Sequence, residues 1–252
     1  MIILAYHSIA PHGELPLSVK VEEFARQMQY FHEQGCQGCS LEEALASEDR
    51  GNGERRVVLT FDDGYGDNYA NAFPVLARLG FTATIFVAVS FVGSRRTFPW
   101  HSRTSPRPLD WGEIAEMAQQ GIVFGSHTLS HPDLTQIPVE DAWREIAQSK
   151  DILEQRLGLE VTSFSYPKGK LSREIQEMVQ AAGYKQAVAL RPPQGAAPGR
   201  FALPRLEVSA RDSSPVFRFK VSRLYQKLTD WGLDGYLNRN WFYSLKKKFS
   251  TR

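Results

Sequence analysis

The sequence predicts an α/β fold in which parallel strands alternate with helices. Short runs of β-branched and aliphatic residues recur along the first 210 residues, and segments with helical apolar periodicity lie between them. Several of these helical segments end at a glycine. The repeating strand–helix order favours a parallel sheet, either open or closed into a barrel, and a chain of 252 residues is long enough for one such domain.

The expected elements follow one another with few interruptions. Besides a short strand before Ser40, the strands are expected at residues 2–6, 57–61, 82–89, 122–126, 162–166, 186–190 and 203–208. Ser40 and Glu43 form a capping box for the second helix, and Asp110 caps the fourth. The helices are expected at residues 21–34, 41–46, 71–79, 111–120, 139–157 and 172–182. The apolar face of the 139–157 helix consists of Trp143, Ile146, Ile152, Leu153 and Leu157.

The end of the chain differs in charge from the rest. Nine Lys and Arg against two Asp and Glu give residues 215–252 a net charge of +7, so residues 1–214 carry −5. We therefore expect one domain over 1–214 and a basic, aromatic-rich helical tail over 215–252. The tail is expected to dock on the outside of the domain, with contact to a membrane surface or an acidic partner as the alternative. No nucleic-acid recognition motif accompanies this charge.

The hydropathy and the first residues bear on location. No stretch approaches the ~18 consecutive apolar residues of a membrane span. The first seven residues have no basic segment, and their apolar run is shorter than that of a signal peptide. We expect a cytoplasmic protein, with membrane association through the tail as the alternative. Cys36 and Cys39 are expected to be structural, because one Cys-x-x-Cys pair without two further ligands is a weak zinc signal.

Two adjacent carboxylates end the strand at residues 57–61. Side chains of neighbouring strand residues point to opposite faces, so Asp62 and Asp63 could not share a site within a regular strand. Gly64 follows directly and allows the backbone to turn, so both carboxylates can reach one cleft. Paired acids at the carboxyl end of a parallel strand indicate chemistry more than packing.

A pair of histidines follows the strand at residues 122–126. The four-residue spacing of His127 and His131 puts both imidazoles on one side if the segment makes a single helical turn. Ligands in α/β proteins bind at the carboxyl ends of the strands, which is where these histidines and the two acids are placed. Two histidines and one carboxylate can hold a metal ion, and the other carboxylate can take a proton from an attacking water. Glycoside hydrolysis is the alternative, but adjacent acids suit its spacing poorly.

Both motifs together resemble the polysaccharide deacetylase family, the NodB-homology domain of carbohydrate esterase family 4. The resemblance covers about residues 1–210 and rests on Tyr6-His7, Thr60-Phe61-Asp62-Asp63-Gly64, the segment from Gly80 to Val87, His127-Thr128-x-x-His131 and Tyr166-Pro167-Lys168-Gly169. It implies a distorted (β/α) barrel, a catalytic domain within residues 1–214 and a divalent metal ion, usually Zn²⁺, with Co²⁺, Ni²⁺ or Mn²⁺ as alternatives.

The resemblance also implies roles for individual residues. Asp62 would be the catalytic base, and the metal ligands would be Asp63, His127 and His131. The backbone N–H of Lys168 would help to stabilise the oxyanion.

Two residues of the family pattern are missing. The family's usual arginine near Ser165 is absent, and Arg205 is expected to orient Asp62 instead, with a surface salt bridge as the alternative. No histidine follows His131 to act as general acid, which leaves His7 and His101 as candidates. His7 is the better placed, at the carboxyl end of a strand, with an ordinary polar role as the alternative.

The expected function is therefore hydrolysis of a non-peptide C–N bond. The substrate would be an N-acetylated carbohydrate, an amino sugar or polysaccharide of bacterial cell-surface or exopolysaccharide metabolism. An amidohydrolase acting on a non-sugar amide is one alternative, and a catalytically inactive carbohydrate-binding protein is another. Asp62 favours the enzyme, because a binding module has no need for a base beside the metal.

Overall fold

The structure, a computed structural model, describes residues 1–11, 15, 17–48, 55–94, 97–100, 106–190, 199–222 and 225. The chain divides into two compact units, Met1–Ala210 and Arg211–Arg252. The boundary expected from charge, after Ser214, lies inside helix α7 (Ser214–Lys220) of the second unit. Among the helices described, none combines the length and apolar character needed to cross a lipid bilayer. The part of the expected helical tail from residue 226 onward lies outside the described residues.

The first unit is built on one parallel sheet, as expected. The central strands are buried along most of their length, which accounts for their near-continuous apolar sequence. The described strands are β1 (Ile2–Tyr6), β2 (Gln37–Cys39), β3 (Arg56–Phe61), β4 (Thr84–Val87), β5 (Val123–Ser126), β6 (Ser163–Ser165), β7 (Gln186–Ala189), β8 (Leu203–Pro204) and β9 (Leu206–Glu207). They are ordered β8-β7-β6-β5-β4-β3-β1-β9, and β2 pairs with β3 outside this path.

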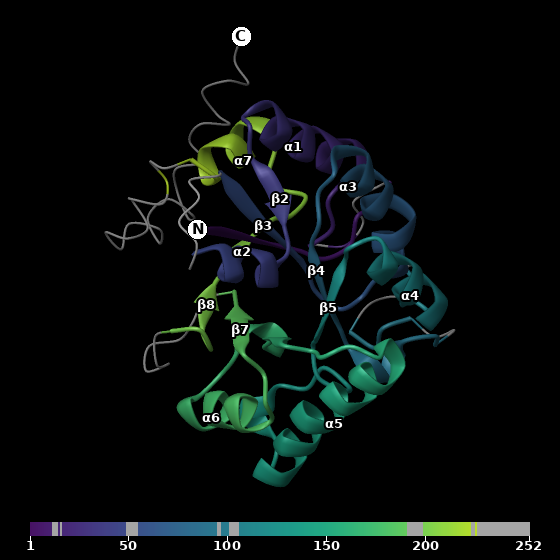
Figure 1. Ribbon diagram of the computed structural model, residues 1–252, viewed down its shortest axis with the longest axis vertical. Coiled ribbons are helices and arrows are strands. Elements are labelled where there is room, and N and C mark those ends of the chain that lie inside the picture. The colour runs from purple at the N-terminus through teal and green to yellow at the C-terminus, as the bar shows by residue number, and fades with distance from the viewer. Residues whose placement is uncertain are drawn as a thin grey trace. The chain divides into compact units, whose positions relative to one another are not determined.

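The two ends of the sheet are joined by one short segment. Residues 203–208 were expected to form a single strand, but two strands flank Arg205. The first, β8, pairs with β7 and the second, β9, pairs with β1. Residues 203–207 pair first with β7 and then with β1, so they cannot form one continuous strand beside a single partner. This exchange closes the sheet into a barrel (Figure 1).

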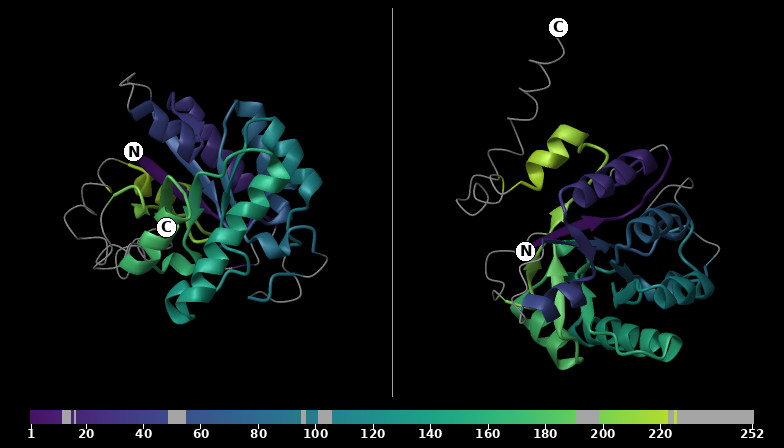
Figure 2. Two further views of the ribbon diagram at one scale, coloured as in Figure 1. Left: turned by 60° about the horizontal axis from the view of Figure 1, so that its bottom comes forward. Right: turned by 45° about the horizontal axis from the view of Figure 1, so that its top comes forward.

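Helices surround the strands of the first unit, as both views in Figure 2 show. The capping box expected at Ser40 and the N-cap expected at Asp110 are confirmed, and Asp110 also forms a capping box with Glu113. The described helices of this unit are α1 (Val21–Glu33), α2 (Leu41–Glu48), α3 (Phe73–Leu79), α4 (Trp111–Gln119), α5 (Val139–Leu157) and α6 (Arg173–Ala181).

Two helices differ from expectation. A π-helical turn, Asn68–Ala72, precedes α3, so the helical segment starts earlier than residue 71. On α5, Trp143 was expected on the buried face, but it is 42% exposed. Ser149 and Lys150 are buried instead, because both find polar partners inside. A pattern of apolar residues alone could not reveal that exchange.

Candidate metal centre and active site

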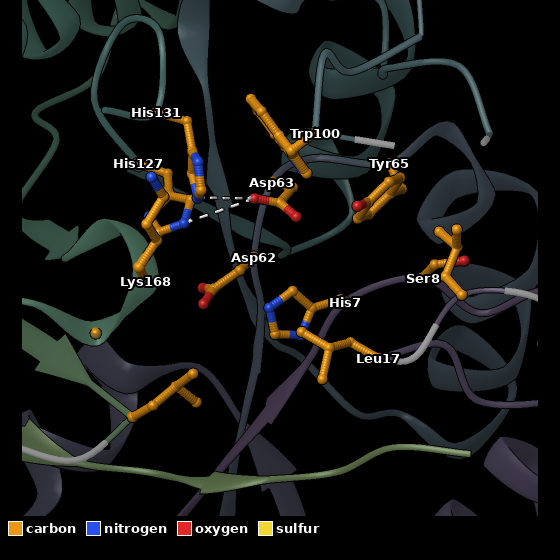
Figure 3. A pocket seen from close by; sticks show the side chains of 13 residues that line it. His7, Ser8, Leu17, Asp62, Asp63, Tyr65, Trp100, His127, His131 and Lys168 are labelled. Carbon is orange, nitrogen blue, oxygen red and sulfur yellow. Dashed lines mark ion pairs between the residues drawn. The ribbon is translucent and has the colours of Figure 1, made fainter. Parts of the chain in front are cut away.

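The carboxyl ends of the strands meet at one pocket with a volume of about 150 Å³. β1 delivers His7, β3 delivers Asp62 and Asp63, and the segment after β5 delivers the two histidines (Figure 3). The pocket is lined by His7, Ser8, Leu15, Leu17, Asp62, Asp63, Tyr65, Trp100, His127, His131, Lys168, Gly169 and Leu190. The structure therefore brings together six of the seven expected site residues in its lining. The seventh, Arg205, lies behind Asp62.

The backbone after β3 turns so that both acids reach the pocket. Asp62 still follows the strand, and its N–H donates to Tyr6 O at 3.0 Å. Asp63 and Gly64 then adopt left-handed conformations with φ of 72° and 79°. The turn expected at Gly64 thus begins one residue earlier, at Asp63. A left-handed non-glycine residue is strained and is a frequent feature of functional sites.

Gly64 is required for two reasons, and its replacement by Ala should destabilise the fold. A left-handed alanine costs about 1–2 kcal/mol, and a Cβ here would lie 2.7 Å from Val87 Cγ1, which adds an overpacking cost of about 1–3 kcal/mol. Gly80→Ala is the matched control, since Gly80 has φ +65° but no atom near the added Cβ. In urea unfolding, G64A should lose clearly more stability than G80A. Equal losses would contradict the close approach.

The two histidines come together without the helical turn on which their four-residue spacing was conditional. Residues 127–131 form an irregular loop in which Thr128 and His131 have φ of 68° and 62°. His127 Nδ1 lies 2.7 Å from Ser165 O, and because a carbonyl can only accept, Nδ1 carries the proton. Nε2 therefore presents its lone pair to the pocket. Such a backbone contact commonly orients a metal-binding imidazole.

Asp63, His127 and His131 form a group that could hold a metal ion. Their ligand atoms lie within 4.8 Å of one another. Asp63 Oδ1 is 3.6 Å from His127 Nε2 and 3.4 Å from His131 Nε2 (Figure 3). This oxygen is buried and has no hydrogen-bond partner within the described residues. A buried carboxylate oxygen facing two imidazoles fits a divalent cation, which would satisfy all three at once.

The electrostatics of these three residues fit the same group. Burial lowers the pKa of His127, and burial together with His127 lowers that of His131 to about 2, so both imidazoles are neutral. Burial and the Asp62 carboxylate raise the pKa of Asp63 to about 7, against hydrogen bonds from Tyr65 and Trp100. A bound cation would favour the ionised form of Asp63.

Asp62 is held by a buried arginine. Arg205 Nη1 donates to Asp62 Oδ1 at 2.8 Å and Nη2 donates to Oδ2 at 2.6 Å. The same guanidinium donates to Thr60 Oγ1 and Ser165 Oγ. Burial would raise the pKa of Asp62, but Arg205 and the nearby histidines hold it well below its usual value. The contact is a bidentate pair with both side chains buried, which is unlike a surface salt bridge.

His7 and Lys168 line other parts of the pocket. His7 is 8% exposed and lies across Asp62 from the histidine pair in Figure 3. Lys168 has φ 59°, and hydrogen bonds of its turn are donated by the N–H groups of Gly169 and Lys170. His101, the other candidate acid, lies outside the described residues.

Aromatic and aliphatic lining residues were not expected from the sequence. Trp100 stacks on His131 with ring centroids 4.3 Å apart. Tyr65 is buried and packs against Phe98. Leu15 and Leu17 lie between β1 and α1, whereas Leu190 follows β7, far away in the chain. Tyr65 could have been found from its place in the Asp-Asp-Gly-Tyr segment, whereas the leucines carry no sequence signal.

The chain is similar to known polysaccharide deacetylases. Residues 49–187 match the family model described as polysaccharide deacetylase. YxkH of Bacillus subtilis (strain 168), whose name assigns it provisionally to the polysaccharide deacetylases, is 34% identical over 220 residues, covering 85% of this chain and 74% of YxkH. PdaC of the same organism, a peptidoglycan-N-acetylmuramic acid deacetylase, is 28% identical over 127 residues, which are 50% of this chain and 24% of PdaC.

Solved structures show the same fold. The Streptococcus pyogenes deacetylase PplD, solved in complex with acetate, matches with a TM-score of 0.76 and 26% identity, covering 88% of this chain and 98% of that chain. This confirms the expected distorted (β/α) barrel of the NodB-homology type. The family model and YxkH confirm the resemblance found in the motifs. The chain belongs to the polysaccharide deacetylase family.

Proposed function

We propose that this deacetylase is a metal-dependent hydrolase that removes the N-acetyl group from an amino sugar of a bacterial cell-surface polysaccharide. The observation that carries the proposal is that two adjacent acids have different surroundings. Asp63 faces two neutral imidazoles, whereas Asp62 is held ionised by Arg205. PdaC supports a substrate of the peptidoglycan or surface-polysaccharide class.

The metal would be held by Asp63 Oδ1, His127 Nε2 and His131 Nε2. Two imidazoles and one carboxylate suit Zn²⁺, and Co²⁺, Ni²⁺ and Mn²⁺ are accepted by similar donors. A divalent cation bound here supplies Lewis-acid chemistry, which polarises the acetamide carbonyl and lowers the pKa of a water molecule.

Asp62 would act as the general base. Arg205 holds its carboxylate with both oxygens engaged and its pKa lowered, so it is ionised and fixed in direction. The attacking water gives its proton to Asp62 while the new C–O bond forms at the acetyl carbon. The backbone N–H of Lys168 would donate to the carbonyl oxygen as negative charge develops on it.

His7 would donate the proton that the leaving nitrogen needs. The C–N bond then breaks, and the products are acetate and the free amine of the sugar. His7 lines the pocket with Asp62, and it contributes to lowering the pKa of Asp62. The base and the acid then follow two different strands, β3 and β1.

Removal of metal tests the proposal. After treatment with a chelator, the protein should release no acetate from N-acetylglucosamine oligomers or peptidoglycan fragments. Added Zn²⁺ or Co²⁺ should restore acetate release. It should also raise Tm, because a bound ion adds RT ln(1 + [L]/Kd) to the free energy of unfolding, where [L] is the concentration of free metal ion and Kd its dissociation constant. Asp63→Asn should block both effects.

The contrary outcomes are distinct. Acetate release from the chelated protein would contradict metal dependence. Bound metal with no release across a broad panel of acylated sugars would contradict the sugar deacetylase and point to a non-sugar amide or to binding without turnover.

A further inference from the structure

A buried chain of hydroxyl groups joins α5 to the loop that carries both histidines. Thr128 N–H donates to Ser126 Oγ at 3.1 Å, and Ser126 Oγ donates to Ser149 Oγ on α5 at 2.7 Å. Ser149 Oγ donates in turn to Ile146 O at 2.8 Å. Ser126, Thr128 and Ser149 are fully buried. A backbone N–H begins this series of hydrogen bonds and a carbonyl oxygen ends it, so Ser126 must donate to Ser149 and Ser149 to Ile146 O.

This series of hydrogen bonds extends from the candidate metal ligand His131 at one end to a backbone carbonyl of α5 at the other. Thr128 Oγ1 accepts the N–H of His131 at 3.0 Å. At the α5 end, Tyr184 OH donates to the same Ile146 O at 3.2 Å. Burial raises the pKa of Tyr184, so its hydroxyl stays a donor. The backbone of His131 is thus connected to the core of the barrel wall through buried groups alone.

A second attachment joins the same helix to the same loop. Glu145 accepts the Ser130 N–H at 2.8 Å and the Ser130 hydroxyl at 2.6 Å. Glu145 and Ser149 are four residues apart on α5, so they lie on one side of the helix. α5 packs against β5, the strand that Ser126 ends (Figure 1). One helix face therefore holds the loop at two points.

The loop needs such support because its backbone is strained. Thr128 and His131 both have positive φ, and each such residue costs of order 1–3 kcal/mol unless the surroundings hold it in place. Without Ser126 Oγ, the buried N–H of Thr128 would lose its acceptor, and an unsatisfied buried donor costs about 1–3 kcal/mol. A shift of the loop would let this N–H find another partner, and His131 would shift with the loop.

We propose that Ser126 and Ser149 are positioning residues of the metal centre. They hold the 127–131 loop in its strained form, so that both Nε2 atoms already converge on Asp63 before the cation arrives. The inference rests on the proposed function in that a divalent cation is the ligand. It assigns to α5 a part in metal affinity, although no residue of α5 lines the pocket.

The test is metal affinity of the apoprotein, measured by Co²⁺ titration with visible absorption and by calorimetry. Ser126→Ala should weaken Co²⁺ binding by about 10–100-fold, the usual effect of losing a group that orients a ligand. Ser149→Ala should weaken it less, because Ser126 still accepts from Thr128. The Co²⁺ absorption band should also change in S126A, because the ligand geometry relaxes.

Ser163→Ala is the matched control. Ser163 is also fully buried, begins the neighbouring strand β6 and loses one side-chain hydrogen bond, to Glu42 Oε1. S163A should lose stability as S126A does but keep the wild-type Co²⁺ affinity. Equal Co²⁺ affinities in S126A and S163A would overturn the inference. Failure of the wild-type protein to bind Co²⁺ would overturn the proposed metal dependence instead, so the two are separable.

Two further variants guard against a folding defect. Glu145→Ala removes the second attachment and should weaken Co²⁺ binding even if S126A proves insoluble. Thr128→Val removes the acceptor for His131 N–H, and its loss of affinity should be less than additive with that of S126A, because both belong to one series of hydrogen bonds. Strict additivity, or wild-type affinity in E145A, would contradict the role of α5.

Discussion

Asp62→Asn should abolish most of the acetate release and leave metal binding intact. A general base contributes about 10²–10⁴-fold to a rate, and Asn at this place keeps the shape but cannot accept the proton. Asp62 shares no ligand atom with the candidate metal group, so the metal should remain. The measurement is kcat for acetate release from N-acetylglucosamine oligomers with added Zn²⁺, Co²⁺ or Ni²⁺, alongside metal content.

The comparison that decides this prediction is Asp63→Asn. D63N should lose metal and activity together, whereas D62N should lose activity alone. Metal-dependent release that survives D62N would show that Asp62 is not the base. Loss of metal in D62N would show that the two neighbouring acids do not divide their work as proposed.

Arg205→Met should lower both stability and activity, because it leaves the Asp62 carboxylate buried without its partner. Breaking a buried ion pair from one side costs about 3–5 kcal/mol. Arg205 is 4% exposed and Asp62 2%, so solvent can replace little of the lost interaction. The rate should fall as well, since a carboxylate without Arg205 takes up a proton more readily and is free to turn. Urea unfolding and kcat measure the two effects.

The double variant Asp62→Asn/Arg205→Met separates charge pairing from packing. Each single variant leaves one unpaired group in the interior, whereas the double variant leaves none charged. We expect D62N/R205M to be more stable than either single variant, and its kcat to be no lower than that of D62N. Additive losses in stability would mean that the two side chains act independently, against the bidentate contact.

Much of this arrangement was predictable from local sequence. Helix limits, capping boxes and buried strands follow from side-chain pattern and short-range hydrogen bonds, and α5 matches its expected bounds of 139–157. The Asp-Asp-Gly and His-x-x-x-His segments were predictable as one site because carboxyl ends of parallel strands meet at one edge. Their grouping in one pocket is confirmed.

Other features needed the tertiary structure. Thr128 and His131 are left-handed, and their backbone N–H groups have side-chain partners, so the spacing of two histidines could not give the path of the loop between them. Trp100 stacks on His131 across a long stretch of chain, which no local pattern encodes.

The sequence by itself determined which residues could do the chemistry and that they lie at strand ends. The tertiary structure decided how the two acids differ. Arg205 meets Asp62 because the segment 203–207 exchanges β7 for β1 and closes the barrel between them. The physical reason is the sequence separation of the interacting residues. Strand and helix patterns arise from residues close together along the chain, whereas the ion pair of Asp62 and Arg205 forms only when distant segments pack together.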